Sequence, residues 1–163
     1  TSRLAGWQSE VAARVVAALL RRGERLATAE SLTGGLIGAA VTSVPGASGA
    51  YLGGVVAYAT AMKARLAGVP EPILAAHGPV AAETAVELAR GVRARTGADW
   101  GLAVTGVAGP DPQDGHQPGE VWIGLAGPDG ATTVRHDVLG DRDAVRARAV
   151  TGALALLEAA LGT

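Results

Sequence analysis

The chain has 163 residues, a formal net charge of −1 and no cysteine, and its length suits a single domain over residues 1–163. The absence of cysteine excludes a disulfide framework, a thiolate nucleophile and the common cysteine-ligated zinc sites. The balanced charge provides no overall basic field, so we expect no nucleic-acid partner.

Hydrophobic residues make up 48% of the chain, but aromatic residues only 3%, and phenylalanine is absent. The core must therefore consist of Ala, Val, Leu and Ile, whose small side chains allow helices to pack closely on a sheet. No apolar run approaches the roughly 18 residues that a membrane span needs. Residues 1–10 lack the basic and apolar blocks of a signal peptide. We expect a cytoplasmic protein with no membrane partner.

Apolar residues at helical and strand spacing predict the elements of the first half of the chain. They indicate a helix over 7–20 that Gly23 ends, a strand over 25–29, a helix over 33–43 and a strand over 52–58.

The second half is predicted to hold a short helix over 61–67 with Thr60 as its cap, a helix over 81–96 and a strand over 99–105. A loop over 106–118, rich in Gly, Pro and Asp, is long enough to be functional. A hairpin of strands over 120–126 and 132–138 and a last helix capped by Asp141 complete the chain.

This order of elements fits a mainly parallel sheet with helices on both faces, which is an α/β protein built as a three-layer α/β/α sandwich. In such folds ligands bind beyond the carboxyl ends of the strands. We expect Ser31, Tyr58 and the loop after Thr105 to lie there.

A serine stands where the first predicted strand gives way to a helix, within residues 29–35 (AESLTGG). Gly34 and Gly35 let the backbone approach a ligand, and the start of the helix presents unpaired N–H groups and a positive dipole end. Ser31 is therefore a candidate nucleophile beside a place that stabilises anions and oxyanions. A serine that only caps the helix is the alternative.

Tyr58 ends a predicted strand, and Lys63 stands in the first turn of the next helix, so we expect both side chains to face one crevice. The positive end of the helix dipole and burial both lower the pKa of a lysine, which suits it to act as a general base. A solvated surface lysine is the alternative.

Residues 104–110 (VTGVAGP) form a strand end and a turn in which Thr105, Gly106 and Gly109 offer hydroxyl and N–H donors to a ligand. The segment matches neither a Walker A sequence nor the pattern of a dinucleotide fold. A plain tight turn explains it equally well.

Arg142 and Arg146 stand one turn apart at the start of the last helix, where an anion bound between them would relieve their conflict with the dipole. Pairing with Asp141 or Asp143 is the alternative. We expect no bound metal, because none of the histidines has metal-ligand spacing and all read as loop or surface residues: His77, His116 and His136.

Taken together, several ordered motifs resemble the CinA C-terminal domain family over nearly the whole chain. The motifs are AESLTGG at 29–35, Tyr58 with Lys63, HGPV at 77–80, TGVAGP at 105–110, PGEVW at 118–122 and GDR at 140–142. Stand-alone members of that family are nicotinamide-nucleotide amidases, which convert nicotinamide mononucleotide to nicotinate mononucleotide and ammonia in pyridine-nucleotide recycling. The resemblance therefore implies an amidohydrolase whose partner is a small-molecule nucleotide.

The resemblance also implies the catalytic roles. Ser31 would attack the carboxamide carbon, and Lys63 would take its proton directly or through Tyr58, to give an acyl-enzyme that water hydrolyses. Backbone N–H groups at Thr33, Gly34 and Gly35 would hold the oxyanion. Neither a metal nor another cofactor is required.

For binding, the resemblance implies that the nucleotide pocket is lined by Thr105, Gly106 and Gly109 and that Arg142 meets the phosphate. Ala-rich helix faces and relatives that self-associate lead us to expect a homodimer.

The chain departs from the family's pattern at three positions. Leu32 stands where many relatives have cysteine, Thr60 where they have asparagine, and Ala81 where they have a serine that caps a helix. Because the change at Thr60 bears on substrate fit, a non-catalytic nucleotide-binding or competence-associated module is the alternative function. A purely structural interaction domain is a third possible function, but it does not explain why the serine, the lysine and the glycine-rich loop occur together.

Overall fold

The computed structural model describes residues 7–162, with side chains described from Glu10 onward. The expectation for the first six residues and for the side chain of Trp7 therefore lies outside the described residues. The first half of the chain contains α1 (Trp7–Arg22), β1 (Leu26–Glu30), α2 (Leu36–Thr42), the 3₁₀ turn η2 (Ala47–Gly49), β2 (Tyr51–Val56) and α3 (Thr60–Ala67). The second half contains α4 (Glu71–His77), α5 (Ala82–Thr96), β3 (Trp100–Gly106), β4 (Glu120–Gly127), β5 (Gly130–Asp137) and α6 (Arg142–Leu161).

The strands form one five-stranded sheet in the order β2-β1-β3-β4-β5. β2, β1 and β3 run parallel, so their carboxyl ends meet at one edge, where Glu30 pairs with Val56 and Val104. β4 runs antiparallel to both β3 and β5. The predicted hairpin of β4 and β5 is confirmed. The sheet is thus mixed, and the expected parallel pairing holds for β2, β1 and β3 but not for β4. The reason is that β4 and β5 follow β3 through a loop and a tight turn, without the crossover helix that a parallel neighbour needs.

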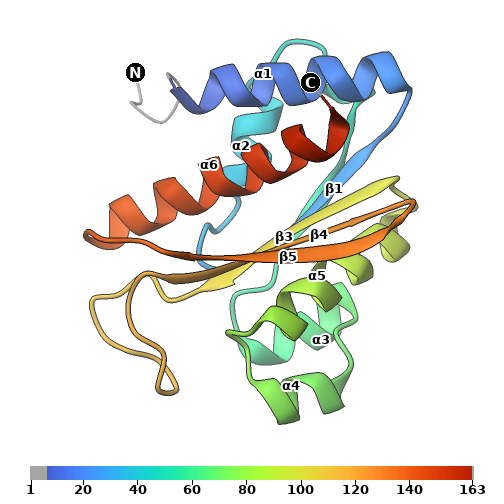
Figure 1. Cartoon of the computed structure of the whole chain (residues 1–163). Helices are drawn as coiled ribbons and strands as arrows, with labels where there is room; N and C mark the ends of the chain where they lie inside the picture. The colour runs from blue at the N-terminus through green and yellow to red at the C-terminus, as the bar shows by residue number, and fades with distance from the viewer. Residues whose placement is uncertain (1–6, 163) are drawn as a thin grey trace.

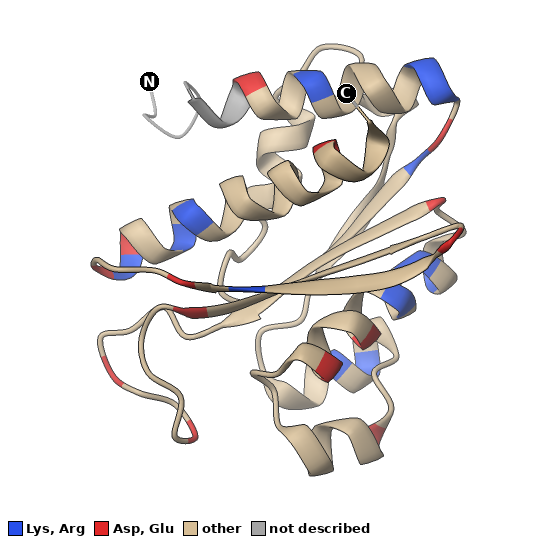
Figure 2. Cartoon of the chain, viewed as in Figure 1, with Lys and Arg blue, Asp and Glu red and all other residues tan. Residues whose placement is uncertain are grey.

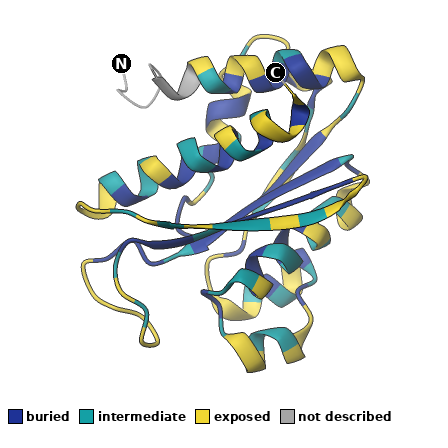
Figure 3. Ribbon diagram, viewed as in Figure 1, coloured by how far each residue is buried: buried dark blue, intermediate teal, exposed yellow. Residues whose placement is uncertain are grey.

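Helices cover both faces of the sheet, which confirms the three-layer α/β/α sandwich (Figure 1). One face carries α1, α2 and α6, and the other carries α3, α4 and α5. The central strands β1, β3 and β4 are largely buried between the two layers, whereas the edge strands β2 and β5 alternate between half-buried and exposed residues (Figure 3). None of the described helices combines the length and the apolar character that crossing a bilayer requires.

Two apolar cores lie on the two faces of the sheet. The larger one joins α1 and α6 to the sheet through Leu19, Leu154 and Ile123, among others. The smaller one holds α5 against alanines of β1 and β3. At Gly101 on β3 a Cβ would overlap the carbonyl oxygen of Ala89 on α5, so only glycine permits this approach. Small residues bring the helix close to the sheet, as the composition predicts.

Several element boundaries differ from the expectation. α2 begins at Leu36 rather than at Thr33, because Gly34 and Gly35 have φ of 57° and 103° and form a turn first. β2 ends at Val56, so Tyr58 follows the strand rather than ending it. The helix α4 was not predicted from the sequence, since it is short, contains a proline and has no buried residue.

The predicted helix caps have two different outcomes. Thr60 is not the cap of α3: it is the first helical residue, and the preceding Ala59 provides no side-chain cap. The cap of α6 is confirmed, because Asp141 Oδ1 accepts a hydrogen bond of 2.9 Å from the N–H of Ala144.

Candidate active site

A cavity of about 370 Å³ lies at the carboxyl ends of β1 and β3, between the loop that follows β2 and the loop that joins β3 to β4. Its lining contains all the predicted site residues except those at 33–35. These lining residues are Ser31, Tyr58, Lys63, Thr105, Gly106, Gly109 and Arg142. Residues far apart in the sequence thus meet in one place, as expected for the strand ends of an α/β sheet.

Ser31 directly follows β1, and the sheet fixes its position. Its N–H donates to the carbonyl of Val104 at 3.0 Å, which extends the pairing of β1 with β3 by one residue. Its side chain is only 6% exposed, and Oγ lies 3.0 Å from Nζ of Lys63. The serine therefore has a nitrogen base within hydrogen-bond distance at the wall of a cavity, the geometry that a serine nucleophile needs.

Lys63 is the only lysine in the sequence, and it is buried, with 1% of its surface exposed. Besides Ser31 Oγ, its Nζ contacts the carbonyl oxygens of Ala57 at 2.9 Å and Tyr58 at 3.2 Å. A neutral amine has two N–H groups and one lone pair. Two carbonyls and one hydroxyl match that set, because the carbonyls accept the two N–H groups and the lone pair can accept the Ser31 proton.

Burial lowers the pKa of Lys63 from its ordinary 10.5 to about 8. No ion pair with a carboxylate counters this effect within the described residues. A substantial fraction of the amine is therefore neutral near pH 8, which is the form that takes up a proton. The alternative of a solvated surface lysine does not describe this side chain.

Tyr58 stands at the mouth of the cavity and is 61% exposed. Its hydroxyl accepts a hydrogen bond of 3.2 Å from Arg142, whereas only its backbone carbonyl contacts Lys63. In the described structure the phenol is thus not placed between Lys63 and Ser31, and a relay through it has no contact to support it. The direct contact between Lys63 and Ser31 favours the direct route.

The Thr33–Gly35 turn follows Ser31 in the chain and is not part of the cavity lining, so the lining does not support the expected oxyanion role. Thr33 is fully buried, and its hydroxyl donates to Oε1 of Glu30 at 2.6 Å. The N–H of Gly34 donates to the carbonyl of Ser31 at 3.1 Å, which occupies that donor. Thr33 and Gly34 thus have contacts within the turn that carries Ser31.

Glu30 is a residue of this site that the sequence interpretation missed. It is 3% exposed, and besides Thr33 it accepts hydrogen bonds from the N–H groups of Ile37 at 2.9 Å and Gly38 at 3.0 Å. The carboxylate thereby caps α2 and accepts two of the N–H groups at the start of this helix, which were expected to be unpaired. The signal was a charged residue at the end of an otherwise apolar strand, just before a glycine pair.

The predicted pair Arg142 and Arg146 serves two different segments. Arg142 donates to the carbonyl of Gly109 at 2.7 Å and to Tyr58, and it lines the cavity. Arg146 instead donates to the carbonyl of Leu32 at 2.9 Å, just after the serine. The two arginines therefore do not form one anion site between them. Of the two, only Arg142 lines the cavity, where its guanidinium can donate to a ligand.

The wall formed by the end of β3 is rigid. Thr105 is buried, and its hydroxyl donates to the carbonyl of Pro79 at 2.6 Å, which ties β3 to another lining segment. Gly106 lines the cavity beside Thr105, and Gly109 lines it through the segment that Arg142 holds. The Thr105 hydroxyl therefore donates its proton within the cavity wall and is not a free donor for a ligand.

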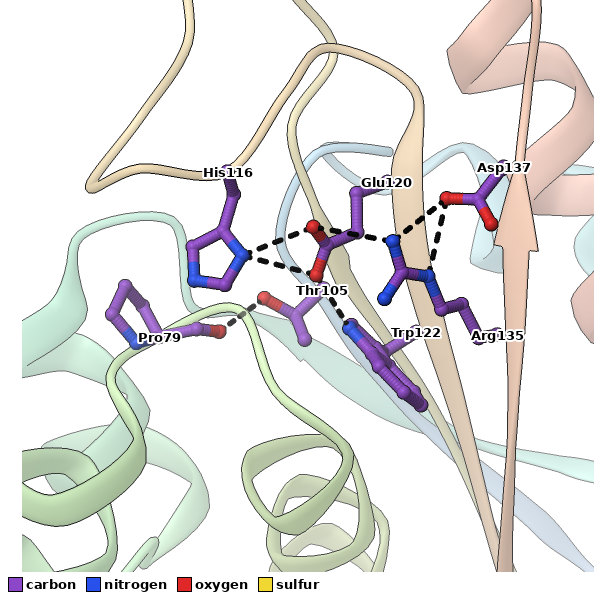
Figure 4. A network of polar contacts seen from close by, with 7 residues as sticks. All are labelled: Pro79, Thr105, His116, Glu120, Trp122, Arg135 and Asp137. Atoms are coloured by element: carbon purple, nitrogen blue, oxygen red, sulfur yellow. Dashed lines mark hydrogen bonds and ion pairs between the residues drawn. The ribbon is translucent and has the colours of Figure 1, made fainter.

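Behind this wall, a polar network fixes the base of the loop (Figure 4). Glu120 accepts hydrogen bonds from His116 Nδ1 at 3.0 Å and Trp122 Nε1 at 2.9 Å, and Arg135 lies 3.6 Å away. Burial would raise the pKa of Glu120, but the hydrogen bonds from Trp122 and His116 and the charge of Arg135 together lower it. His116 is thus a half-buried partner of a carboxylate, not a plain surface residue. Within residues 7–162, no three His, Asp or Glu side chains gather so that they could hold a metal ion.

Comparisons with known proteins agree on one family. The family model of the CinA C-terminal domain matches residues 8–161. A CinA-like protein of Frankia casuarinae is 52% identical over 143 residues, which are 88% of this chain and 33% of that protein. A competence-damage inducible protein of Geobacillus kaustophilus is 50% identical over 143 residues, or 86% of this chain and 34% of that protein. The chain thus spans about a third of the length of these curated relatives.

Solved structures show the same likeness. A CinA superfamily protein from Klebsiella pneumoniae superposes with a TM-score of 0.91 at 36% identity, covering 94% of this chain and 97% of that one. The competence/damage inducible protein CihA from Agrobacterium tumefaciens superposes with a TM-score of 0.93 at 31% identity, covering both chains completely.

Proposed function

Because the chain belongs to the CinA C-terminal domain family, we propose that it is a nicotinamide-nucleotide amidase acting on nicotinamide mononucleotide. The observation that carries the proposal is the 3.0 Å contact between Lys63 Nζ and Ser31 Oγ at the wall of the cavity. A serine beside a buried amine of lowered pKa is suited to acyl transfer at neutral to mildly alkaline pH.

In the proposed reaction, Ser31 Oγ attacks the carboxamide carbon of the nucleotide while neutral Lys63 takes the hydroxyl proton. As the C–N bond of the tetrahedral intermediate breaks, Lys63 gives this proton to the departing amide nitrogen, which leaves as ammonia. Water attacks the resulting ester, again with Lys63 as the base, and nicotinate mononucleotide leaves. One water is consumed, one ammonia is released, and Ser31 and Lys63 return to their starting state.

The developing oxyanion needs a donor at the cavity wall, which the Thr33–Gly35 turn does not provide. Leu32 lines the cavity directly beside Ser31, and its N–H is our candidate for this donor. Arg146 holds the Leu32 carbonyl at 2.9 Å and thereby fixes the peptide that follows the nucleophile. In the same proposal, Arg142 binds the phosphate with the N–H groups that Gly109 and Tyr58 leave free.

Ammonia release from nicotinamide mononucleotide by the purified protein tests the proposal. We expect turnover by the wild type and none by Ser31→Ala. As a matched control, Ser48→Ala changes an exposed serine on η2 and should leave the rate unchanged. A folded wild type that binds the nucleotide but releases no ammonia would overturn the proposal and select the non-catalytic nucleotide-binding module instead.

A further inference from the structure

The loop between β3 and β4, residues 107–119, forms one side of the cavity. Its first arm, from Val107 to Gln113, lines the cavity together with Ser31 and Lys63. The loop therefore contributes residues to the ligand's surroundings that the proposed reaction does not use.

Three sets of contacts hold this loop in place. At its base, Val107 and the chain at 119–120 exchange backbone hydrogen bonds of 2.8 and 2.9 Å. Arg142 holds the first arm through the carbonyl of Gly109 at 2.7 Å. His116 on the returning arm contacts the buried Glu120 at 3.0 Å (Figure 4). The first arm is thus fixed relative to Ser31 before a ligand enters.

Asp111 lies on this fixed arm, between Pro110 and Pro112. Proline restricts its own φ and also the backbone of the residue before it, so Asp111 has little conformational freedom to lose on binding. Asp111 is one of the residues that line the cavity and is exposed, and its carboxylate has no hydrogen bond or ion pair within the described part of the chain. A carboxylate without a partner, on a backbone segment that other contacts hold at the cavity wall, is available to a ligand.

The depths of the lining residues suggest which part of a ligand Asp111 meets. Ser31 and Lys63 are buried at the inner end of the cavity, whereas Tyr58, Arg142 and Asp111 are exposed at its mouth. Acidic positions on the loop and basic positions at the start of α6 can be followed in Figure 2. A nicotinamide nucleotide with its carboxamide at Ser31 has its ring inside and its ribose and phosphate toward the mouth.

We propose that Asp111 is a specificity-determining residue that accepts hydrogen bonds from the two ribose hydroxyls of the nucleotide. The inference rests on the proposed function, because that function supplies the ligand. Two carboxylate oxygens match two neighbouring O–H donors, and hydrogen bonds to a charged acceptor are the stronger kind. Carboxylates hold ribose hydroxyls in the same way in dinucleotide-binding folds. Asp111 therefore selects nucleotides over free nicotinamide, which has no hydroxyls.

The test measures binding without turnover, by calorimetry on the Ser31→Ala protein. The probes are nicotinamide mononucleotide and its 2′,3′-dideoxy analogue. We expect Asp111→Asn to raise the Kd of the nucleotide about tenfold, because the amide offers one neutral acceptor in place of two charged ones. For the dideoxy analogue, the two proteins should have the same Kd within about twofold, since the hydroxyls are absent.

The matched control is Asp114→Asn on the same loop. Asp114 is exposed, lies outside the cavity lining and has φ of 51°, which asparagine tolerates. It should leave both Kd values unchanged, which separates a local role of Asp111 from a general loss of negative charge.

An unchanged Kd of the nucleotide in Asp111→Asn would overturn the inference. An equal loss for both probes would also overturn it, because the carboxylate would then attract the cationic pyridinium ring rather than the ribose. Absence of binding to the Ser31→Ala protein would do the same. Ammonia release by the wild type is read separately, so failure of the amidase proposal and failure of the Asp111 role are distinguishable.

Discussion

Two buried ionisable side chains, Glu30 and Lys63, lie near the carboxyl ends of the parallel strands, and their surroundings are opposite in kind. Glu30 at the end of β1 accepts three hydrogen bonds, from Thr33, Ile37 and Gly38. Lys63 in the first turn of α3 has two carbonyls and one hydroxyl as partners, and no described carboxylate pairs with it. The surroundings of Glu30 stabilise a charge, whereas those of Lys63 suit a neutral amine.

This difference separates a structural group from a reactive one. Donors and the start of α2 compensate the desolvation of Glu30, so its carboxylate holds the turn that carries Ser31. The desolvation of Lys63 is not compensated by an opposite charge, so its pKa falls to about 8. Burial alone therefore does not make a residue catalytic; the partners of the buried group decide its role.

The largest expected effect comes from replacing Lys63, the reactive member of this pair. Lys63→Met should lower kcat for ammonia release about a thousandfold, because no other described group contacts the Ser31 hydroxyl as a base. Steady-state assays at pH 8 provide the measurement. Lys63→Arg is the matched control: it keeps a cation and its donors but has no lone pair, and it should be equally inactive. A Lys63→Met protein with a tenth of the wild-type rate would refute Lys63 as the base.

The second effect concerns stability as a function of pH. Below pH 8 the buried amine of Lys63 is charged in both the folded and the unfolded protein, and the desolvation cost is fully present. Between pH 8 and 10.5 the folded protein loses this proton while the unfolded one keeps it, so the wild type gains stability as the pH rises.

Lys63→Met lacks this titration and provides the reference. Relative to this variant, the free energy of unfolding of the wild type should rise by about 3 kcal/mol between pH 7 and 11. Urea unfolding at a series of pH values measures the difference. A pH-independent difference would mean that burial does not perturb the amine.

The third effect tests the structural role of Glu30. Glu30→Gln should lower the free energy of unfolding by about 2 kcal/mol, because the amide nitrogen cannot accept the hydrogen bonds that the carboxylate takes from Thr33 and α2. Urea unfolding at pH 7 is the measurement. Glu83→Gln, on an exposed carboxylate of α5, should change it by less than about 0.5 kcal/mol. Equal stability of Glu30→Gln and the wild type would refute the role given to Glu30.

The smallest effect sharpens the choice between the two proton routes. Tyr58→Phe removes a hydroxyl that meets Arg142 and not Lys63, so kcat should stay within about threefold of the wild type. The same assay measures the KM, which should rise modestly because Arg142 loses one partner at the cavity mouth. A hundredfold loss of kcat would instead place the phenol in the proton path.

The sequence predicted the layers of this fold well, because apolar periodicity and helix ends are local signals. The helices at 7–22 and 142–161 and the buried strand at 100–106 follow such signals. Strand direction is not local, because it depends on how each connection crosses the sheet. The hairpin of β4 and β5 was predicted from its tight turn, but the antiparallel pairing of β4 with β3 was missed. α4 was missed since its Pro72 and its exposed side chains obscure any helical pattern.

The candidate site was predicted in part for a similar reason. Ser31 and Lys63 follow strands, and parallel strands bring their carboxyl ends together, so their proximity could be inferred. The direction in which a turn presents its N–H groups could not be, and the oxyanion role expected of Thr33, Gly34 and Gly35 does not fit the cavity. Glu30 was overlooked because two of its three partners come from α2, whose start at Leu36 the pattern did not locate, and the third, Thr33, comes from the turn before it.

The most direct test of the account is the pKa of the Lys63 amine. Since Lys63 is the only lysine in the sequence, protein labelled with isotope-enriched lysine gives a single Nζ-linked signal that NMR can follow with pH. The account predicts a titration midpoint near pH 8. An amine that stays protonated through pH 10, in the free protein and with nicotinamide mononucleotide bound to Ser31→Ala, would contradict it.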